Sequence, residues 1–292
     1  MMFGFVADDP QVEAAFKREA SPQLSAIKFQ RAIVDGLVLN AAEVNILSSM
    51  PVSSYPANSL YIHGRPFELS QGRASGRVMG FINLPLIKLL HRLASSLISG
   101  AWLARRARVN MIFCYSLHTP FLLAAVILRW MSGSALTVMI NDLPLNMAGK
   151  PESGVRAVLK KLDDRVLRSL VSKADLVLPV SKGIITDWLP AAKNWLVVEA
   201  IAPSNEVQLP DWSRTGGKNI LYAGNFSHVL NFAKLFHEAS DLDARLNFVG
   251  GGPEEAELRA LAAVDERITV KSFMHGEAFQ KEHLAADYFV NA

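Results

Sequence analysis

Hydrophobic residues recur along this chain with two alternating periods, one typical of helices and one typical of short buried strands. Apolar positions at helical spacing predict helices over 23–38, 84–106, 121–131, 155–171 and 182–189. Short apolar runs predict strands at 3–7, 44–47, 111–115, 135–140, 175–180 and 195–200. The stretch 51–80 is rich in Pro, Gly and Ser without a clear period, so we expect an irregular excursion there. Strands that alternate with helices in this way predict a doubly wound α/β sheet.

The pattern begins again after residue 217. Residues 219–292 repeat a unit of strand, glycine-containing turn and helix, and they finish on a strand. The intervening stretch 202–217 is polar and contains Pro and Gly, which is typical of a linker between domains. We therefore predict an N-terminal Rossmann-like domain over 1–201, a linker over 202–217 and a C-terminal Rossmann-like domain over 218–292. We expect the second parallel sheet to be incomplete.

Composition narrows the class of protein. Of 292 residues, 50% are hydrophobic and 20% are charged, which indicates a globular chain with an ample core. The formal net charge of +3 is too small to indicate a nucleic-acid partner, but it is compatible with an anionic membrane surface. The one cysteine, Cys114, excludes an intramolecular disulfide and lies in an apolar run, so we expect a buried thiol.

The sequence also bears on location. Its first residues lack the basic and apolar regions of a signal peptide. The longest apolar run, 121–128, is interrupted by Arg129 and is too short to span a bilayer. We expect a cytoplasmic protein, with attachment to the inner face of the membrane left open.

The predicted helix 84–106 is amphipathic and basic. One side is marked by the leucines Leu86, Leu90, Leu93 and Leu97, and the basic residues Lys88, Arg92, Arg105 and Arg106 are available for the other. This helix could lie on an anionic bilayer with its apolar side toward lipid. Alternatively, the leucines pack on the N-terminal domain and the basic residues stay in water. Both interpretations remain open at this point.

Glycine turns in the C-terminal array are candidates for phosphate binding. Gly224 ends a predicted strand just before a helix, where free backbone N–H groups could approach a diphosphate. Gly250, Gly251 and Gly252 do the same one strand later, with Pro253 suited to the first turn of the next helix. The alternative is ordinary turn chemistry, because glycine ends many strands and this run does not match the G-x-G-x-x-G fingerprint.

Polar residues that follow strands supply candidates in the N-terminal domain. Asp142 follows the strand 135–140, and a carboxylate at a strand's carboxyl end could orient or deprotonate an acceptor hydroxyl. His118 follows the strand that ends at Tyr115 and is similarly placed. Glu199 closes the last predicted strand at the domain boundary. Each has a structural alternative: an Asp in a turn, a solvated or structural His, and a Glu on the surface.

Six motifs in order resemble one known family. The N-terminal motifs are Asn-Asp-Leu-Pro-Leu-Asn-Met at 141–147, Leu-Pro-Val-Ser at 178–181 and Val-Val-Glu-Ala-Ile at 197–201. The C-terminal motifs are Tyr-Ala-Gly at 222–224, Phe-Val-Gly-Gly-Gly-Pro-Glu at 248–254 and Ala-Ala-Asp-Tyr-Phe-Val-Asn at 285–291. As an ordered set they resemble the family-4 retaining glycosyltransferases of GT-B architecture, in the branch that builds exopolysaccharides and cell-surface glycans.

The resemblance implies a two-domain enzyme with a cleft between the domains. The N-terminal domain would hold a glycan or lipid-linked acceptor, with Asp142 and His118 as catalytic candidates and Glu199 in the cleft. The C-terminal domain would hold a nucleotide-sugar donor through the turns and loop that contain Gly224, Asn225, Phe226, Ser227, Gly250, Gly251, Gly252, Pro253, Phe273 and Met274. Phe273 and Met274 lie where the family holds the nucleobase. No metal or other cofactor is implied, since the sequence has no ligand cluster and this fold characteristically works without one.

The chain departs from the family in two ways. Many members carry an arginine and, five residues on, a lysine that grip the donor diphosphate, whereas this chain has Asn225 and Leu230. Relatives also continue beyond 292 with a segment that includes a carboxylate for the donor sugar. A glycosyltransferase, or the larger part of a truncated one, is therefore the first hypothesis. The alternatives are a non-catalytic GT-B-like subunit that pairs with a second chain to complete the domain, and, more weakly, a sugar-nucleotide epimerase.

Overall fold

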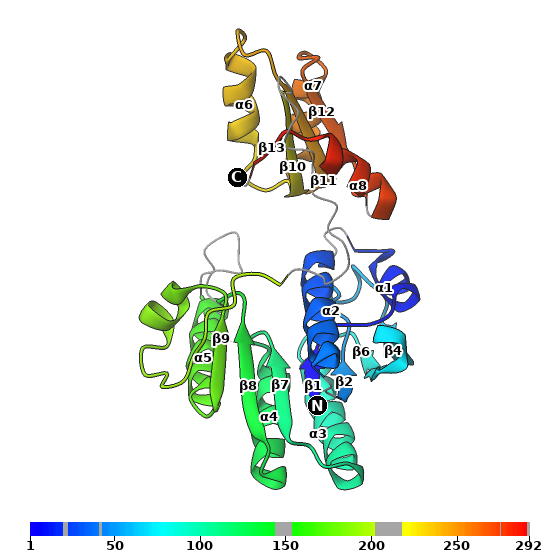
Figure 1. The fold of residues 1–292 in the computed structure, drawn as a ribbon, viewed down its shortest axis with the longest axis vertical. Coiled ribbons are helices and arrows are strands. Elements are labelled where there is room, and N and C mark those ends of the chain that lie inside the picture. Colours follow the sequence, from blue (N-terminus) through cyan, green and yellow to red (C-terminus); the bar gives the residue numbers. More distant parts are fainter. Residues whose placement is uncertain (20–22, 41–42, 144–153, 202–217, 275, 291–292) are drawn as a thin grey trace. The chain divides into compact units, whose positions relative to one another are not determined.

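The computed structural model describes residues 1–19, 23–40, 43–143, 154–201, 218–274 and 276–290. The chain divides into two compact units, Met1–Ser204 and Asn205–Ala292, each with its own sheet (Figure 1). The predicted linker 202–217 lies outside the described residues, as does the part of the 141–147 motif after Leu143.

The N-terminal unit is built on a seven-stranded sheet whose strands run in the order β4-β5-β2-β1-β7-β8-β9. The strands are β1 (Met2–Gly4), β2 (Val44–Ser48), β4 (Pro66–Leu69), β5 (Ala74–Val78), β7 (Met111–Tyr115), β8 (Ala135–Ile140) and β9 (Leu176–Pro179). All neighbours are parallel except the edge pair β4–β5. The order reverses at β1, which lies between β2 and β7, so the carboxyl end of β1 is the switch point of the sheet.

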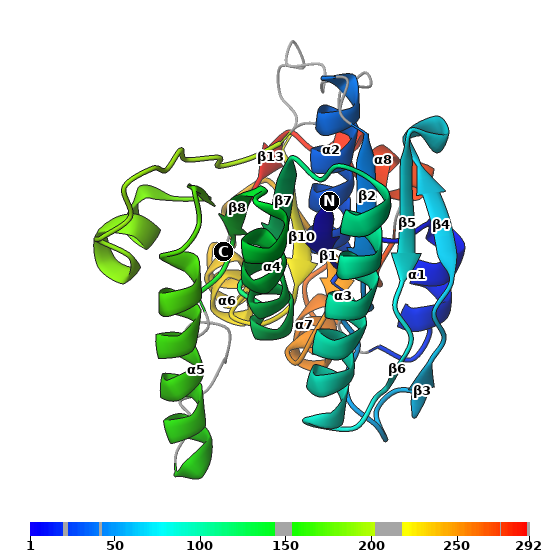
Figure 2. The ribbon, with the colours of Figure 1, turned by 90° about the horizontal axis from the view of Figure 1, so that it is seen from below.

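Helices cover both faces of this sheet. One core cluster joins the strands to α3 (Ile87–Arg106), α4 (Thr119–Ser132) and α5 (Val155–Val171), with α3 and α4 side by side (Figure 2). A second cluster joins the opposite face to α1 (Asp9–Phe16) and α2 (Leu24–Leu39). The predicted doubly wound α/β architecture is confirmed.

The smaller elements complete the N-terminal unit. A short antiparallel pair joins β3 (Tyr61–Ile62) to β6 (Phe81–Ile82). A 3-10 turn, η1 (Ser70–Gly72), lies between β4 and β5, and a π-helical turn, η2 (Ile184–Trp188), follows β9. None of the helices in the described ranges is both long and apolar enough to cross a membrane.

The prediction of an irregular excursion over 51–80 is wrong, because β5 lies within the parallel sheet and β4 forms its edge. The sequence Ala-Ser-Gly-Arg-Val of β5 has little of the branched and aromatic character that marks strands. Its Gly76 is required by packing, since a Cβ there would come within 2.3 Å of the Phe67 ring on β4. The interpretation of 195–200 as a strand is also wrong. That segment makes one isolated bridge, Val177 to Trp195, and a few backbone hydrogen bonds to β9.

The C-terminal unit has a parallel sheet in the order β12-β11-β10-β13. Its strands are β10 (Asn219–Asn225), β11 (Arg245–Gly251), β12 (Ile268–Lys271) and β13 (Tyr288–Phe289). The helices α6 (Leu230–Glu238) and α7 (Glu255–Ala262) pack on one face, and α8 (Gly276–Ala285) packs on the other. The strand order reverses at β10, so this unit is doubly wound like the first.

Helix α3 buries a different side from the one predicted. Its buried residues are Arg92, Ser96 and Gly100, and a Cβ on Gly100 would come within 2.3 Å of Leu128 on α4. The small residues let α4 approach closely, which fixes the rotation of α3. Leu86 and Leu90 are consequently 72% and 66% exposed. Leu93 and Leu97, by contrast, are half-buried and pack against the core of the N-terminal unit. The expected division therefore fails for Arg92, which is buried, and for Leu86 and Leu90, which do not pack with the other two leucines.

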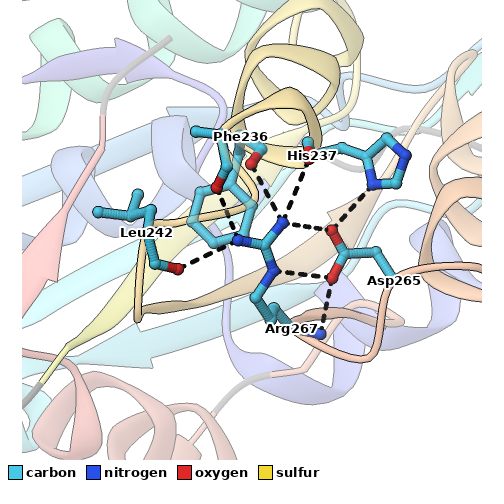
Figure 3. A network of polar contacts seen from close by, with 6 residues as sticks. Phe236, His237, Leu242, Asp265 and Arg267 are labelled. Atoms are coloured by element: carbon cyan, nitrogen blue, oxygen red, sulfur yellow. Dashed lines mark hydrogen bonds and ion pairs between the residues drawn. The ribbon is translucent and has the colours of Figure 1, made fainter.

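A network around Arg267 holds the end of α6 to the start of β12 (Figure 3). The Arg267 guanidinium donates to the carbonyl oxygens of Ala239 (2.8 Å) and Leu242 (3.1 Å) and to the Asp265 carboxylate (2.8 Å). His237 Nδ1 donates to the same carboxylate at 2.9 Å. Because Arg267 precedes β12, the network lies at the amino edge of the parallel sheet, away from the glycine turns. We assign it a structural role.

The hydrogen bond from Arg267, with that from His237, holds the pKa of Asp265 well below its usual range. Such a group stabilises the folded state above the unfolded pKa of about 3.9 and loses that contribution as the pH falls through the folded pKa. Asp265→Asn should therefore lower the free energy of unfolding of this unit by about 1–2 kcal/mol at pH 7. The difference from wild type should shrink in acid.

Hydrogen exchange of peptides from 218–290 in the full chain measures this stability. Asp243→Asn is the matched control, because Asp243 pairs with Lys218 on the open surface and its loss should change little. Equal effects of the two substitutions would contradict the structural role of the network.

Candidate functional site

A cavity of about 540 Å³ opens at the carboxyl edge of the N-terminal sheet. Most of its lining comes from the residues that follow four neighbouring parallel strands: Phe5 after β1, Pro51–Ser53 after β2, Ser116–His118 after β7, and Asn141 and Asp142 after β8. Carboxyl ends of parallel strands meet at one edge, and the reversal at β1 opens a crevice there. The structure thereby brings His118 and Asp142, two residues that sequence analysis singled out separately, to one cavity.

His118 is held as a neutral ring. Its Nε2 lies 3.3 Å from Arg92 Nη1, and arginine can only donate, so Nε2 accepts and the ring proton resides on Nδ1. Burial, followed by the charges of Arg92 and Lys88, places the pKa of His118 well below its usual range. Nδ1 is buried and has no partner among the described residues. The ring therefore offers a hydrogen-bond donor and not a free base.

Asp142 lies exposed at the rim of the cavity. Burial and then the charge of Asp142 raise the pKa of the Tyr115 phenol to about 12. Tyr115 therefore keeps its proton at neutral pH and faces the cavity as a neutral hydroxyl. A carboxylate at the rim is placed to accept a proton or a hydrogen bond from a hydroxyl bound in the cavity.

Sequence analysis missed Arg92 as a lining residue, because it assigned this arginine to the basic side of its helix. Arg92 is 5% exposed and lines the cavity. The available signal was the four-residue spacing of Arg92, Ser96 and Gly100, since small residues at that spacing mark close helix packing. Glu199 does not join the cavity. It is exposed on the irregular segment beside β9.

In the C-terminal unit, the glycines let two turns pack on each other. A Cβ on Gly250 would come within 1.9 Å of the Gly224 carbonyl oxygen, and one on Gly252 would come within 2.7 Å of the Phe226 nitrogen. The turns are also hydrogen-bonded: Phe226 N–H donates to Gly251 O at 2.9 Å, and Glu254 N–H donates to Phe226 O at 3.0 Å. The packing of the turns therefore accounts for these two glycines without a ligand.

The N-terminus of α6 already holds a carboxylate. Glu254 Oε2 accepts from Val229 N–H at 2.8 Å and from Leu230 N–H at 2.9 Å. These are amides at the helix end where the sequence predicted a diphosphate. The free amides and the helix dipole attract an oxyanion at this end of α6, and the Glu254 carboxylate occupies that position.

The remaining donor candidates lie at the same edge of the sheet, on the turns and loop after β10, β11 and β12. Asn225 and Pro253 are exposed, Ser227 and Gly251 are half-buried, and the Phe226 side chain is fully buried in the core. Phe273, which follows β12, is 48% exposed, and Met274 packs beside the small core cluster on the α8 face. Among the described residues, no group of three or more His, Cys, Asp or Glu is arranged to hold a metal.

Comparisons with known proteins establish the fold. Neither a protein-family model nor a curated protein sequence matches the chain. The structure is similar to that of Arabidopsis thaliana UGT89C1 complexed with UDP-L-rhamnose, with a TM-score of 0.57 and 11% identity over 99% of this chain and 73% of that one. It is similar to Anabaena HepE in complex with UDP, with a TM-score of 0.51 and 13% identity over 99% and 72% of the two chains.

A third similar structure is a putative UDP-N-acetylglucosamine 2-epimerase from Listeria monocytogenes, with a TM-score of 0.50 and 10% identity over 95% of this chain and 70% of that one. The chain therefore has the GT-B glycosyltransferase fold. At these identities the likeness establishes the fold alone, and the same fold includes the epimerase.

Gly250→Ala should destabilise the C-terminal unit by about 1–3 kcal/mol, because the added methyl group forces the two turns apart. Gly251→Ala is the matched control, since a Cβ there meets nothing closer than 3.4 Å and should change stability by less than about 0.5 kcal/mol. Hydrogen exchange of peptides from β10 and β11 reads out both. Equal destabilisation by the two substitutions would show that the close approach of the Gly250 turn to Gly224 does not explain why glycine is needed at position 250.

Proposed function

We propose that this chain is a glycosyltransferase of the retaining family-4 type. It would transfer a sugar from a nucleotide-sugar donor to a glycan or lipid-linked acceptor in cell-surface polysaccharide biosynthesis. The observation that supports this most is the cavity at the switch point of the N-terminal sheet, which brings Asp142 and His118 together. The GT-B fold adds support, since the similar structures of UGT89C1 and HepE hold UDP-L-rhamnose and UDP.

In this proposal the acceptor binds in the N-terminal cavity. The Asp142 carboxylate orients or deprotonates the acceptor hydroxyl, and His118 Nδ1–H donates a hydrogen bond to an oxygen of the same molecule. The nucleotide-sugar donor binds at the carboxyl edge of the C-terminal sheet, where Phe273 stacks on the nucleobase. Charge on the leaving diphosphate is stabilised by backbone amides after β10. As the family resemblance implies, no metal or cofactor takes part.

The second candidate is a GT-B-like subunit that does not catalyse transfer and acts with a second chain. The Glu254 cap favours it, because a carboxylate on the α6 amides repels a diphosphate. Asn225 and Leu230, at positions where the family carries cations, favour it as well. The two candidates differ in one measurable property, which is binding of nucleotide sugars by the chain alone.

Isothermal titration of the full chain with UDP- and GDP-sugars separates the candidates. The transferase proposal expects saturable binding of at least one. It also expects Glu254→Gln to bind about fivefold more tightly, since like charges about 4 Å apart repel by about 1 kcal/mol in water. Glu257→Gln, on the exposed side of α7, is the matched control and should leave binding unchanged. If neither the wild type nor Glu254→Gln releases or absorbs heat with any nucleotide sugar, the transferase proposal is wrong and the non-catalytic subunit is the remaining candidate.

Contact with the cytoplasmic face of an anionic membrane is a further part of the proposal. Helix α3 and the residue before it expose Leu86, Leu90, Ile98 and Trp102, and the exposed Arg105 and Arg106 end the helix. Apolar side chains beside cations suit lipid and acidic headgroups.

Co-sedimentation with phosphatidylglycerol vesicles should therefore exceed that with phosphatidylcholine vesicles. The double variant Leu86→Glu, Leu90→Glu should lose this binding, whereas Leu235→Glu, at an exposed position of α6, should keep it. Sedimentation that does not depend on the lipid, or on the double substitution, would rule membrane contact out.

A further inference from the structure

The cavity of the N-terminal unit contains a buried positive charge without a counter-ion. The Arg92 guanidinium lies 4.5 Å from the centre of the Phe81 ring, and Nε donates to Ser49 Oγ at 2.9 Å. Nη2 donates to Met50 O at 2.6 Å. None of the ion pairs formed by the described residues includes Arg92. A buried charge of this kind is costly unless it is paired.

A second cation lies one helical turn away. Lys88, at i−4 from Arg92 on α3, donates through Nζ to Val52 O at 3.3 Å. Burial and then the charge of Arg92 lower the pKa of Lys88, which Glu19 partly opposes. Like charges four residues apart destabilise a helix unless something compensates them. Of the carboxylates that line the cavity, Glu19 is already held by Ser53 and Asn58, and Asp142 lies at the rim.

Residues that line the cavity carry unused hydrogen-bonding groups. Arginine has five N–H donors, and Arg92 uses three of them, on Ser49, Met50 and His118. His118 Nδ1 is a buried donor without a partner among the described residues. The buried amide oxygen of Asn141 is also unpartnered there, and rotation of this amide would present N–H donors instead. Arg92 on the lining, Lys88 one helical turn away, and the spare donors of lining residues fit a multiply charged oxyanion.

We propose that the cavity beside Arg92 binds a phosphoryl group carried by the acceptor, an inference that rests on the transferase proposal. A phosphoryl group carries a charge of about −1.5 to −2 and three acceptor oxygens, which match the two cations and the spare donors better than a carboxylate does. The acceptor is therefore a phosphorylated molecule, and Arg92 selects it. Its sugar-accepting hydroxyl lies toward Asp142 at the rim.

Titration of the full chain with phenyl phosphate, benzoate and benzyl alcohol tests this proposal, with the ring nitrogens of ¹⁵N-labelled histidine as the readout. Phenyl phosphate should shift the Nδ1 signal of His118 in a saturable way, benzoate should do so about tenfold more weakly, and benzyl alcohol should not. No shift with phenyl phosphate on wild-type protein overturns the proposal, even if every Arg92 variant fails to fold.

Variants of Arg92 then test whether phenyl phosphate binds in the acceptor cavity or at the donor site. Arg92→Met should weaken phenyl phosphate binding by about tenfold or more, and Arg92→Lys should weaken it less. Arg165→Met, on the exposed surface of α5, is the control and should bind as wild type does. UDP binding by Arg92→Met should equal that of wild type. An equal loss of UDP and phenyl phosphate would mean that the anion belongs to the donor, which overturns the acceptor assignment.

Failure of this inference and failure of the transferase proposal remain distinguishable. Loss of the phenyl phosphate response with nucleotide-sugar binding intact removes the phosphoryl site alone. Phenyl phosphate binding without any nucleotide-sugar binding supports the anion site but overturns its role in sugar transfer.

Discussion

The reversal of strand order at β1 is the constraint on which the N-terminal site depends. Because β2 and β7 both pair with β1 in parallel, the loops after three strands must leave the same edge and diverge. The loop after β8 joins them, and a cavity forms where the loops part. His118 and Asp142 share a site for this reason, although one follows β7 and the other follows β8. The position of the candidate site therefore follows from the topology of the sheet, and its chemistry follows from the side chains placed there.

Each unit has a buried or capping charge at the carboxyl edge of its sheet. In the N-terminal unit the charge is the Arg92 cation, which lacks a carboxylate partner and holds His118 neutral through Nε2. In the C-terminal unit it is the Glu254 anion, which occupies two amides of α6. The C-terminal unit, where we propose that the donor binds, thus has a negative charge at this edge, and the N-terminal unit, where we propose that the acceptor binds, has a buried positive charge. A diphosphate that binds at the N-terminus of α6 has to displace the Glu254 carboxylate or bind beside it against charge repulsion. An anionic acceptor would instead supply the counter-ion that Arg92 lacks among the described residues.

Much of the fold could be predicted from the sequence because most strands are short apolar runs between polar turns. The runs at 111–115 and 135–140 coincide with β7 and β8, and the helix over 155–171 coincides with α5. Strand β5 was missed because its small and polar residues form a strand only beside β2 and under Phe67. The local sequence pattern of β5 contains no information about these neighbours, which come from other strands.

The same limit applies to the site. The candidates His118 and Asp142 could be found because each directly follows a strong strand signal. The spacing of Arg92, Ser96 and Gly100 indicates a closely packed side of α3, but it does not place Arg92 in the cavity, because that position depends on Ser49 and Met50, more than 40 residues earlier in the chain. Glu254 reaches amides about 25 residues away, so its capping role needs the packed turns to be visible. Gly250 and Gly252 could be recognised as required glycines, but their requirement comes from the neighbouring turn.

The central claim is that the carboxyl edge of the C-terminal sheet binds a nucleotide sugar. Hydrogen exchange of the full chain with and without saturating UDP- or GDP-sugar tests it most directly. The account predicts slower exchange in peptides that cover 224–230 and 250–255 and in the segment after β12, with the network around Arg267 unchanged. Unchanged exchange at those turns with every nucleotide sugar would contradict it.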